Sequence, residues 1–324
     1  MCELFTGGTA MIYTVTTSPS LDLVMKLQNP LAIGQTNRAV SEELRPGGKG
    51  INISIMLHNL GVTSTAFGFV AGFSGDELMR LTAATGVKTG FLRVRRGRTR
   101  INVRIKETPE QTSINGLGPE VSADDIQYMV RKLSGLTSDD YLVLAGMVPP
   151  SLPHDIYSIF FEALKENSQP KVIVDAPADQ FKYILKYRPF LIKPNINELK
   201  EYVNMQFNNG QDVLNACYKL QEEGARNILV SIGKYGAVFL DEDGNATRIA
   251  APGGEMIDRT GAGDSMISGF LADYIVNHNL KSAAMMAVAT GSATATTDGI
   301  AIRDTVDELR KQMTDGSSFD DPIV

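Results

Sequence analysis

The sequence predicts an α/β protein in which helices cover both faces of a mostly parallel β-sheet. From residue 120 onward, strand-like and helix-like segments alternate along the chain. Several strand-like segments, such as "YLVLAG" (141–146) and "KVIVDAP" (171–177), are continuous apolar runs, as buried parallel strands require. Polar or glycine-rich motifs follow these strands, and ligands of such sheets bind beyond the carboxyl ends of the strands.

The expected elements follow in a regular order after residue 140. Strands are expected at 141–146, 171–177, 190–195 and 227–233, and helices at 154–166, 178–186, from about 196, and at 211–223. The segment 236–250 predicts a β-hairpin, because the turn Asp243-Gly244-Asn245 separates two strand-like arms.

The N-terminal third has a different pattern. The segment 48–60 predicts a helix and 64–70 a further core strand, but three other segments are short, strand-like and more polar: 11–28, 37–45 and 91–116. We therefore expect a single α/β core that carries a small β appendage built from two separate insertions, about 11–45 and 91–118.

One domain is expected over residues 11–313 of the 324-residue chain. Residues 1–10 are interpreted as an N-terminal extension or tag, and 314–324 has the composition of a frayed C-terminal tail.

The composition argues against several classes of protein. A net charge of -6 and a pI near 5.2 disfavour binding to nucleic acid, which needs a basic surface. Two cysteines and three scattered histidines provide neither a disulfide framework nor a zinc site. Because the chain has no apolar run of roughly 20 residues and no secretory-signal pattern, we expect a cytoplasmic protein without a membrane partner.

A turn of small residues leads into a helix at "DRTGAGDSMISGF", residues 258–270. Gly261, Ala262 and Gly263 precede Asp264, and an apolar helical pattern follows. The first N–H groups of a helix lack partners and, together with the helix dipole, attract anions. Asp264 therefore either caps the helix or works beside the anion that the turn holds.

Paired glycines precede another helix at "RPGGKGINISIMLHNLG", residues 45–61. Gly47 and Gly48 allow a ligand to approach the backbone, and Lys49 and Asn52 would face it from the first turn. The spacing is not that of a Walker A loop, and an ordinary loop is the alternative interpretation.

Cationic side chains share one face of a predicted strand at "RVRRGRTRINVRIKE", residues 93–107. Arg100, Asn102, Arg104 and Lys106 alternate with apolar residues. A guanidinium binds phosphate in a bidentate manner, so Arg100 and Asn102 predict a site for a small phosphorylated metabolite. A solvated edge strand is the alternative.

The segment "LIKPNINELKEY", residues 191–202, combines Lys193 with Asn195 and Glu198 at a helix start. Asn195 and Glu198 have the spacing of a capping box, which is one interpretation. The other is that they organise the water shell of Mg²⁺, with Lys193 directed at a phosphate.

Ser231, Gly233 and Gly236 follow a strand in "VSIGKYGAVF", residues 230–239. They indicate close approach of the backbone to a nucleotide, although a hairpin turn explains the same residues.

The order of these motifs resembles that of the ribokinase-like sugar kinases, the PfkB family. The resemblance covers Met11 to about residue 313, and "GGKGIN" and "DRTGAGD" match the two family signatures. Within the family, "TRINVRIK", "INGLGP" and "IKPNINEL" are most similar to bacterial 1-phosphofructokinases, followed by tagatose-6-phosphate kinases. The resemblance implies a three-layer α/β/α core with a small β-sheet lid that closes over the sugar and forms a homodimer contact.

The resemblance also implies a role for each candidate residue. Asp264 would be the general base that takes a proton from the sugar hydroxyl, while Gly261, Ala262 and Gly263 would offer N–H groups to the transferred phosphoryl group. Asp22, in "SPSLDLV", matches the aspartate that binds sugar hydroxyls. The sugar pocket would be lined by Gly47, Gly48, Lys49 and Asn52. The phosphate already on the sugar would be bound by Arg100 and Asn102. ATP and Mg²⁺ would be bound by Lys193, Asn195, Glu198, Ser231, Gly233 and Gly236.

The function that the resemblance implies is ATP- and Mg²⁺-dependent conversion of fructose 1-phosphate to fructose 1,6-bisphosphate. Tagatose 6-phosphate is the nearest alternative substrate, and a sugar-phosphate-binding regulator without turnover is an alternative class. A nucleoside kinase is disfavoured, because an unphosphorylated substrate gives Arg100 no partner. Two departures from the family pattern bear on specificity: Met147 replaces a serine near the sugar, and Arg259 replaces a smaller residue near the nucleotide.

Overall fold

The computed structural model describes residues 10–106, 111–164, 169–313, 317–321 and 323. Ten strands form its main sheet: β1 (Ile12–Thr16), β4 (Ser64–Val70), β5 (Lys88–Thr89), β6 (Leu92–Arg93), β9 (Tyr141–Ala145), β10 (Lys171–Asp175), β11 (Leu191–Ile192), β12 (Asn227–Ser231), β13 (Ala237–Leu240) and β14 (Ala246–Ile249). Their order is β14-β13-β12-β11-β10-β9-β1-β4-β5, with β6 paired to β4. All pairs are parallel except those of β13, which is antiparallel to β12 and β14.

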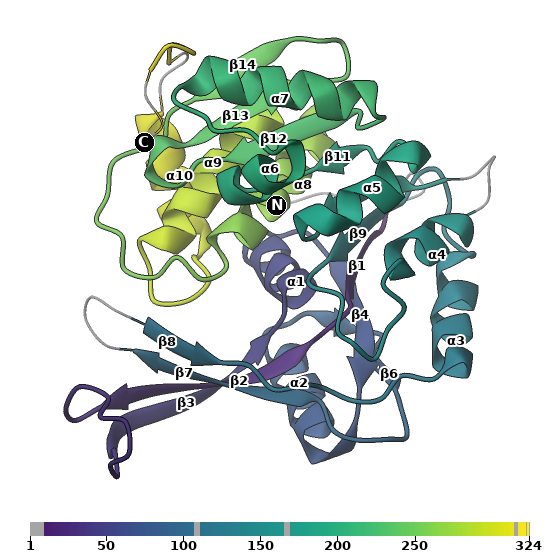
Figure 1. Ribbon diagram of the computed structural model, residues 1–324, viewed down its shortest axis with the longest axis vertical. Helices are drawn as coiled ribbons and strands as arrows, with labels where there is room; N and C mark the ends of the chain where they lie inside the picture. Colours follow the sequence, from purple (N-terminus) through teal and green to yellow (C-terminus); the bar gives the residue numbers. More distant parts are fainter. Residues whose placement is uncertain (1–9, 107–110, 165–168, 314–316, 322, 324) are drawn as a thin grey trace, which may run out of the picture.

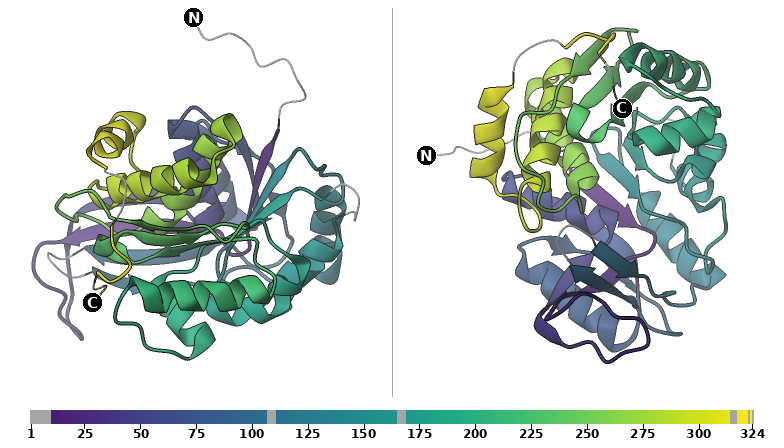
Figure 2. Two further views of the ribbon diagram at one scale, coloured as in Figure 1. Left: turned by 90° about the horizontal axis from the view of Figure 1, so that it is seen from above. Right: turned by 60° about the vertical axis from the view of Figure 1, so that its left-hand side comes forward.

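Helices cover both faces of this sheet (Figure 2, left). One face carries α1 (Lys49–Asn59), α8 (Ala262–Asn277) and α9 (Leu280–Ala295), with α10 (Arg303–Gln312) packed outside them. The other face carries α3 (Ala123–Leu133), α4 (Ile156–Glu162), α5 (Phe181–Ile184), α6 (Ile196–Val203) and α7 (Gly210–Glu222), together with the short 3₁₀ turns η1 (Ala178–Gln180) and η2 (Leu185–Tyr187). The predicted α/β architecture is confirmed.

The central strands are apolar along their whole length because both of their faces are covered. All five residues of β9 are buried, as are the first four of β12. Their side chains divide between two core clusters, so that Leu142 packs on one side of the sheet and Val143 on the other. The predicted hairpin is also present, since β13 and β14 pair across the turn at Asp243–Asn245.

A second sheet of four strands projects from the main domain beside α2 (Gly72–Ala84) (Figure 1). We call it the lid: β2 (Ser20–Leu27), β3 (Ala39–Gly47), β7 (Arg100–Lys106) and β8 (Gln111–Ile114), in the order β3-β2-β7-β8. β2 is antiparallel to β3 and parallel to β7, so the two insertions meet in the middle of the lid.

The predicted N-terminal bound of the lid is wrong. Residues 12–16 form β1, which lies between β4 and β9 in the main sheet rather than in the appendage. Ile12 and Val15 are fully buried there, and the chain enters the lid only at Ser20. A short strand with alternating polar residues did not reveal from sequence that it is covered on both faces.

The described part of the C-terminal segment is docked rather than frayed, which corrects the prediction for 314–324. The N–H of Gln211 donates to the carbonyl of Phe319 at 3.0 Å, and the N–H of Ile323 donates to the carbonyl of Asn208 at 3.3 Å. Ile323 is 6% exposed and belongs to the large core cluster beneath α3–α7. The segment therefore closes the core beside the start of α7.

Among the described residues, no helix combines the length and apolar character needed to span a bilayer.

The docked tail predicts that Ile323→Ala destabilises the fold by about 2 kcal/mol, because it deletes buried methyl groups. Urea unfolding measures this change. Ile302→Ala is the matched control, because Ile302 is 60% exposed and its truncation is expected to change stability by less than about 0.5 kcal/mol. Equal effects of the two substitutions would mean that the tail does not contribute to the core.

Candidate active site

Asp264 lies in the first turn of α8, directly after the glycine turn. Gly261 precedes the helix with a φ of 79°, a left-handed conformation that favours glycine. No side chain among the described residues caps this end of α8. The N–H of Ala262 donates to the carbonyl of Arg259 at 3.3 Å, so among the described residues the N–H groups of Gly263 and Asp264 are the ones left for an anion.

Asp264 is buried and has a neutral hydrogen-bond partner. Its Oδ2 accepts a hydrogen bond from Nδ2 of Asn52 in α1 at 2.7 Å. Burial, followed by repulsion from Asp175, raises the pKa of Asp264 to about 6, against the opposing influence of Lys49, Asn52 and Lys193. A carboxylate with a pKa near the working pH is suited to accept a proton.

A second buried carboxylate, Asp175, was not singled out by the sequence. It ends β10, and its Oδ1 lies 2.9 Å from Nζ of Lys49 and 3.4 Å from Nζ of Lys193. Burial opposes ionisation, but the two ammonium groups outweigh it and lower the pKa of Asp175. Its only sequence signal was a carboxylate at the end of an apolar strand, where parallel sheets place their sites.

Lys193 also lies against the glycine turn. A Cβ added to Gly263 would stand 3.2 Å from Nζ of Lys193, so a side chain at that position would crowd the ammonium group. Lys193 is only 4% exposed, and it places a positive charge beside the open N–H groups of α8. The sequence analysis directed Lys193 at a phosphate but did not predict its contact with the glycine turn.

Asp22 occupies the lid side of the site and has three partners. It accepts hydrogen bonds from Oγ of Ser20 at 2.7 Å and from Nδ2 of Asn102 at 2.8 Å, and it pairs with Nη2 of Arg104 at 2.7 Å. A Cβ on Gly47 would come within 2.6 Å of the Asp22 carboxylate, which explains the glycine. Arg104 is a second residue whose role the sequence analysis missed.

A cavity of about 280 Å³ opens on the lid side, next to Asn52, the hydrogen-bond partner of Asp264. It lies between the lid, α1 and the segments before α8 and after α9, and Asp22, Asn52, Arg104 and Thr260 line it. Asn52, which lines this cavity, also donates to Asp264, so the cavity beside the predicted sugar ligand lies one side chain away from the predicted base.

Arg100 begins β7 and lies opposite Ser20 of β2 in the lid. Its Nη2 donates to the carbonyl of Ser18 at 2.9 Å, and its Nη1 lies 3.8 Å from Sδ of Met147. Its Nε is buried without a partner among the described residues, and burial lowers its pKa. A guanidinium with an unused donor is suited to an anionic ligand.

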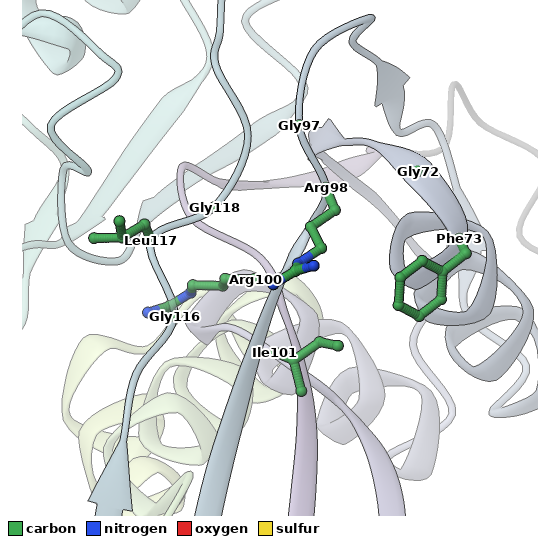
Figure 3. Close-up of a pocket in the computed structure, with 9 residues that line it drawn as sticks. All are labelled: Gly72, Phe73, Gly97, Arg98, Arg100, Ile101, Gly116, Leu117 and Gly118. Carbon is green, nitrogen blue, oxygen red and sulfur yellow. The ribbon is translucent and has the colours of Figure 1, made fainter.

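Figure 3 shows a second cavity, of about 640 Å³, at the base of Arg100. Arg98, Phe73 and Arg100 all border it, and the side chain of Arg100 points toward Gly116, on the side away from Phe73. Arg100 therefore lines this cavity, while its guanidinium group contacts Ser18 and Met147.

Asn195 and Glu198 form a complete capping box at the start of α6. Asn195 Oδ1 accepts from the N–H groups of Asn197 and Glu198, and Glu198 Oε2 accepts from the N–H of Asn195 at 2.8 Å. The structural alternative from sequence is thus realised. Burial, followed by Asp175, raises the pKa of Glu198, which places this carboxyl group near the charge cluster.

Ser231 ends β12 beside α6, and its N–H donates to the carbonyl of Pro194 at 3.1 Å. Gly233 begins the 3₁₀ turn η3 (Gly233–Tyr235), and Gly236 follows it with a φ of 85°. A Cβ on Gly236 would lie 2.0 Å from the carbonyl oxygen of Ile249. Strand packing alone therefore requires glycine at position 236. Ser231 and Gly233 lie at the carboxyl end of β12, where parallel sheets bind ligands.

Gly48 precedes α1 with a φ of 117°, and a Cβ there would contact Thr16 at 2.6 Å. The "GGKG" turn thus lets α1 begin close against the end of β1. This approach brings Lys49 and Asn52 to Asp175 and Asp264.

A family comparison agrees with this geometry. The family model described as pfkB family carbohydrate kinase matches residues 12–305. The chain belongs to the pfkB family of carbohydrate kinases. Its ribokinase-like fold, its kinase activity and the family resemblance of its motifs are thereby shown.

Relatives of this pfkB kinase cover nearly its whole length. A 1-phosphofructokinase of Bacillus subtilis is 36% identical over 92% of this chain and 97% of its own. A D-tagatose-1-phosphate kinase of Bacillus licheniformis is 32% identical over 94% of this chain and 98% of its own. Phosphofructokinase-2 from Escherichia coli, solved with substrates and products, has a TM-score of 0.87 at 25% identity and covers 93% of this chain and 99% of its own.

The raised pKa of Asp264 predicts an acid limb in the pH profile of kcat/KM. Only the ionised carboxylate accepts a proton, so kcat/KM should fall as the pH drops through about 6. Because a substrate phosphate also titrates near pH 6, the decisive comparison is with Lys49→Met. Lys49 lowers the pKa of Asp264, so its removal should shift the limb to higher pH. Identical midpoints in both proteins would contradict this assignment.

Proposed function

We propose that this kinase transfers the terminal phosphoryl group of ATP to the 6-hydroxyl of fructose 1-phosphate, giving fructose 1,6-bisphosphate. The observation that supports this most is a buried Asp264 with a raised pKa at the start of α8, hydrogen-bonded to Asn52, which lines the same cavity as Asp22. Arg100, whose buried Nε has no partner among the described residues, binds the phosphate already on the sugar. The 1-phosphofructokinase relatives support the same substrate.

Asp264 acts as the general base in this mechanism. Its carboxylate takes the proton of the 6-hydroxyl while that oxygen forms a bond to the terminal phosphorus and the bond from phosphorus to the ADP oxygen breaks. The amide of Asn52 holds the Asp264 carboxylate in place through one oxygen, and leaves the other for the hydroxyl.

Charge on the transferred group is offset by fixed dipoles and one cation. The N–H of Gly263 stabilises the phosphoryl oxygens, joined by that of Ala262 once it leaves the carbonyl of Arg259. Lys193 adds its positive charge beside them. Since Asp175 already fixes the position of Lys193, little reorganisation accompanies the reaction.

The sugar is held between the lid and α1. Asp22 and Asn102 offer oxygen and amide groups to hydroxyls, Gly47 and Gly48 let the sugar approach the backbone, and Arg100 binds the 1-phosphate. ATP lies along the carboxyl ends of β12 and β11, beside Ser231 and Gly233.

Mg²⁺ is proposed to accompany ATP without direct protein ligands. Among the described residues, no group of three or more acidic, histidine or cysteine side chains converges on one point. The side-chain oxygen of Asn195 and one oxygen of Glu198 are used in the capping box, which fits contact through water to the remaining Glu198 oxygen. The ion would neutralise phosphate charge on ATP.

The second candidate substrate is tagatose 1-phosphate, which the B. licheniformis relative favours by its name. Both sugars present the phosphate of carbon 1 to Arg100, so phosphate binding is the same for both. Selection between fructose and tagatose therefore depends on contacts to the ring hydroxyls. The tagatose 6-phosphate alternative from sequence has no such support among these relatives. A coupled assay of ADP release with all three sugar phosphates tests the proposal, and equal inactivity on all would overturn it.

The lid is also proposed to form a homodimer contact. All four residues of β8 are exposed, and large apolar side chains on the lid are open to solvent, among them Val40, Leu44 and Ile114.

Asp264→Asn is expected to lower kcat by at least about 10³-fold with a modest change in KM, because a general base acts in the transition state. The matched control is Asp273→Asn, the same substitution further along α8, for which activity should stay unchanged. Steady-state assays with saturating fructose 1-phosphate measure both. Turnover in Asp264→Asn equal to that of the control would return Asp264 to a capping role.

A further inference from the structure

Ion pairs join both lid insertions to the segments that flank α8 and α9. Nζ of Lys106, at the end of β7, lies 2.9 Å from Oδ2 of Asp258 and 2.7 Å from Oδ1 of Asp298. Nη1 of Arg45, in β3, donates to the same Oδ1 of Asp298 at 3.0 Å. All four residues line the cavity of about 280 Å³ beside Asp22, but none is among the sugar, phosphate or nucleotide contacts proposed above.

Asp258 links Lys106 to the glycine turn through a hydrogen bond with Thr260. Its Oδ1 accepts a hydrogen bond from the N–H of Thr260 at 2.9 Å, while its Oδ2 faces Lys106. The hydroxyl of Thr260 accepts from Nη1 of Arg104 at 3.0 Å. Arg104 and Lys106 are successive inward-facing residues of β7, so one lid strand contacts both Thr260 and Asp258, which lie one and three residues before Gly261.

The two pairs of Lys106 differ in burial. The side chain of Asp258 is 7% exposed, whereas that of Asp298 is 60% exposed. An exposed ion pair contributes little, but a buried carboxylate that loses its cation is strongly disfavoured. Burial opposes ionisation of Asp258, yet the hydrogen bonds from Lys106 and Thr260 outweigh it and lower its pKa.

We propose that Lys106 is a positioning residue for phosphoryl transfer, whose ammonium group holds Asp258 and, through it, the Thr260 N–H so that the glycine turn faces the phosphoryl group. The inference rests on the proposed kinase function. Because Lys106 is part of the lid, its ammonium group reaches Asp258 only when the lid lies against the main domain. The glycine turn therefore takes its working geometry only in that arrangement.

This role separates turnover from sugar binding. Without the Lys106 ammonium group, Asp258 is left buried and unpaired, and the segment 258–260 must shift to reach solvent. Asp22 and Arg100 keep partners that do not include Lys106. The defect should therefore appear in kcat and not in the KM for the sugar phosphate.

The first test compares Lys106→Met with Lys26→Met. Lys26 lies directly opposite Lys106 in the β2–β7 register and is exposed, so it receives the same substitution one strand away. We expect kcat of Lys106→Met to fall about 10- to 100-fold, with the KM for the sugar phosphate within about 3-fold of wild type. Lys26→Met should match wild type. A Lys106→Met variant that also matches wild type overturns the inference.

The second test is chemical rescue of Lys106→Ala. Methylammonium is a small hydrogen-bonding cation that fits the vacated place, so it should restore part of kcat. Tetramethylammonium, at the same ionic strength, donates no hydrogen bond and should restore none. A loss that methylammonium does not reverse indicates a merely structural role and overturns the inference.

The double variant Asp258→Asn/Lys106→Met guards against misfolding of the single variants. It removes both charges together, so it leaves no unpaired carboxylate, and its kcat should exceed that of Lys106→Met. A double variant no more active than Lys106→Met counts against the inference. Wild-type inactivity on every sugar phosphate overturns the proposed function as well, whereas wild-type activity with unaffected Lys106 variants overturns the inference alone.

Discussion

The candidate site depends on a buried carboxylate, Asp264, that has no cation of its own. Its hydrogen-bond partner is the neutral amide of Asn52, while the nearby cations Lys49 and Lys193 are held by Asp175. This division of charge keeps Asp264 basic enough to accept a proton. It also keeps two ammonium groups beside the place where phosphate charge accumulates, at fixed positions and without a direct ion pair to the base.

The second constraint is that polar residues of the lid and of the main domain line the same cavity. Asp22 sits on β2 yet borders the same cavity as Asn52 of α1 and Thr260 before α8. The lid strand β7 holds Asp22 through Asn102 and Arg104 and holds the start of α8 through Arg104 and Lys106. A single strand therefore aligns the sugar contacts with the phosphoryl contacts, which explains why its charged residues alternate so strictly.

Sequence patterns predicted the buried strands and the motif residues, because periodicity and glycine turns are local properties. They did not predict pairings between distant segments: Asp175 meets Lys49, 126 positions away, and nothing in "KVIVDAP" shows that contact. The place of β1 in the main sheet is likewise set by its neighbours β4 and β9 rather than by its own residues. The burial of Ile323 could not be predicted from the polar tail for the same reason. It depends on contacts with the core cluster and with Asn208, before α7.

A crystal structure with fructose 1-phosphate and a non-hydrolysable ATP analogue tests the central claim most directly. The account predicts that the 6-hydroxyl lies within hydrogen-bond reach of Asp264, roughly 2.6–3.2 Å, with the 1-phosphate on Arg100 and the terminal phosphate of the nucleotide at the start of α8. A sugar bound in the opposite direction, with its phosphate beside Asp264, would contradict it.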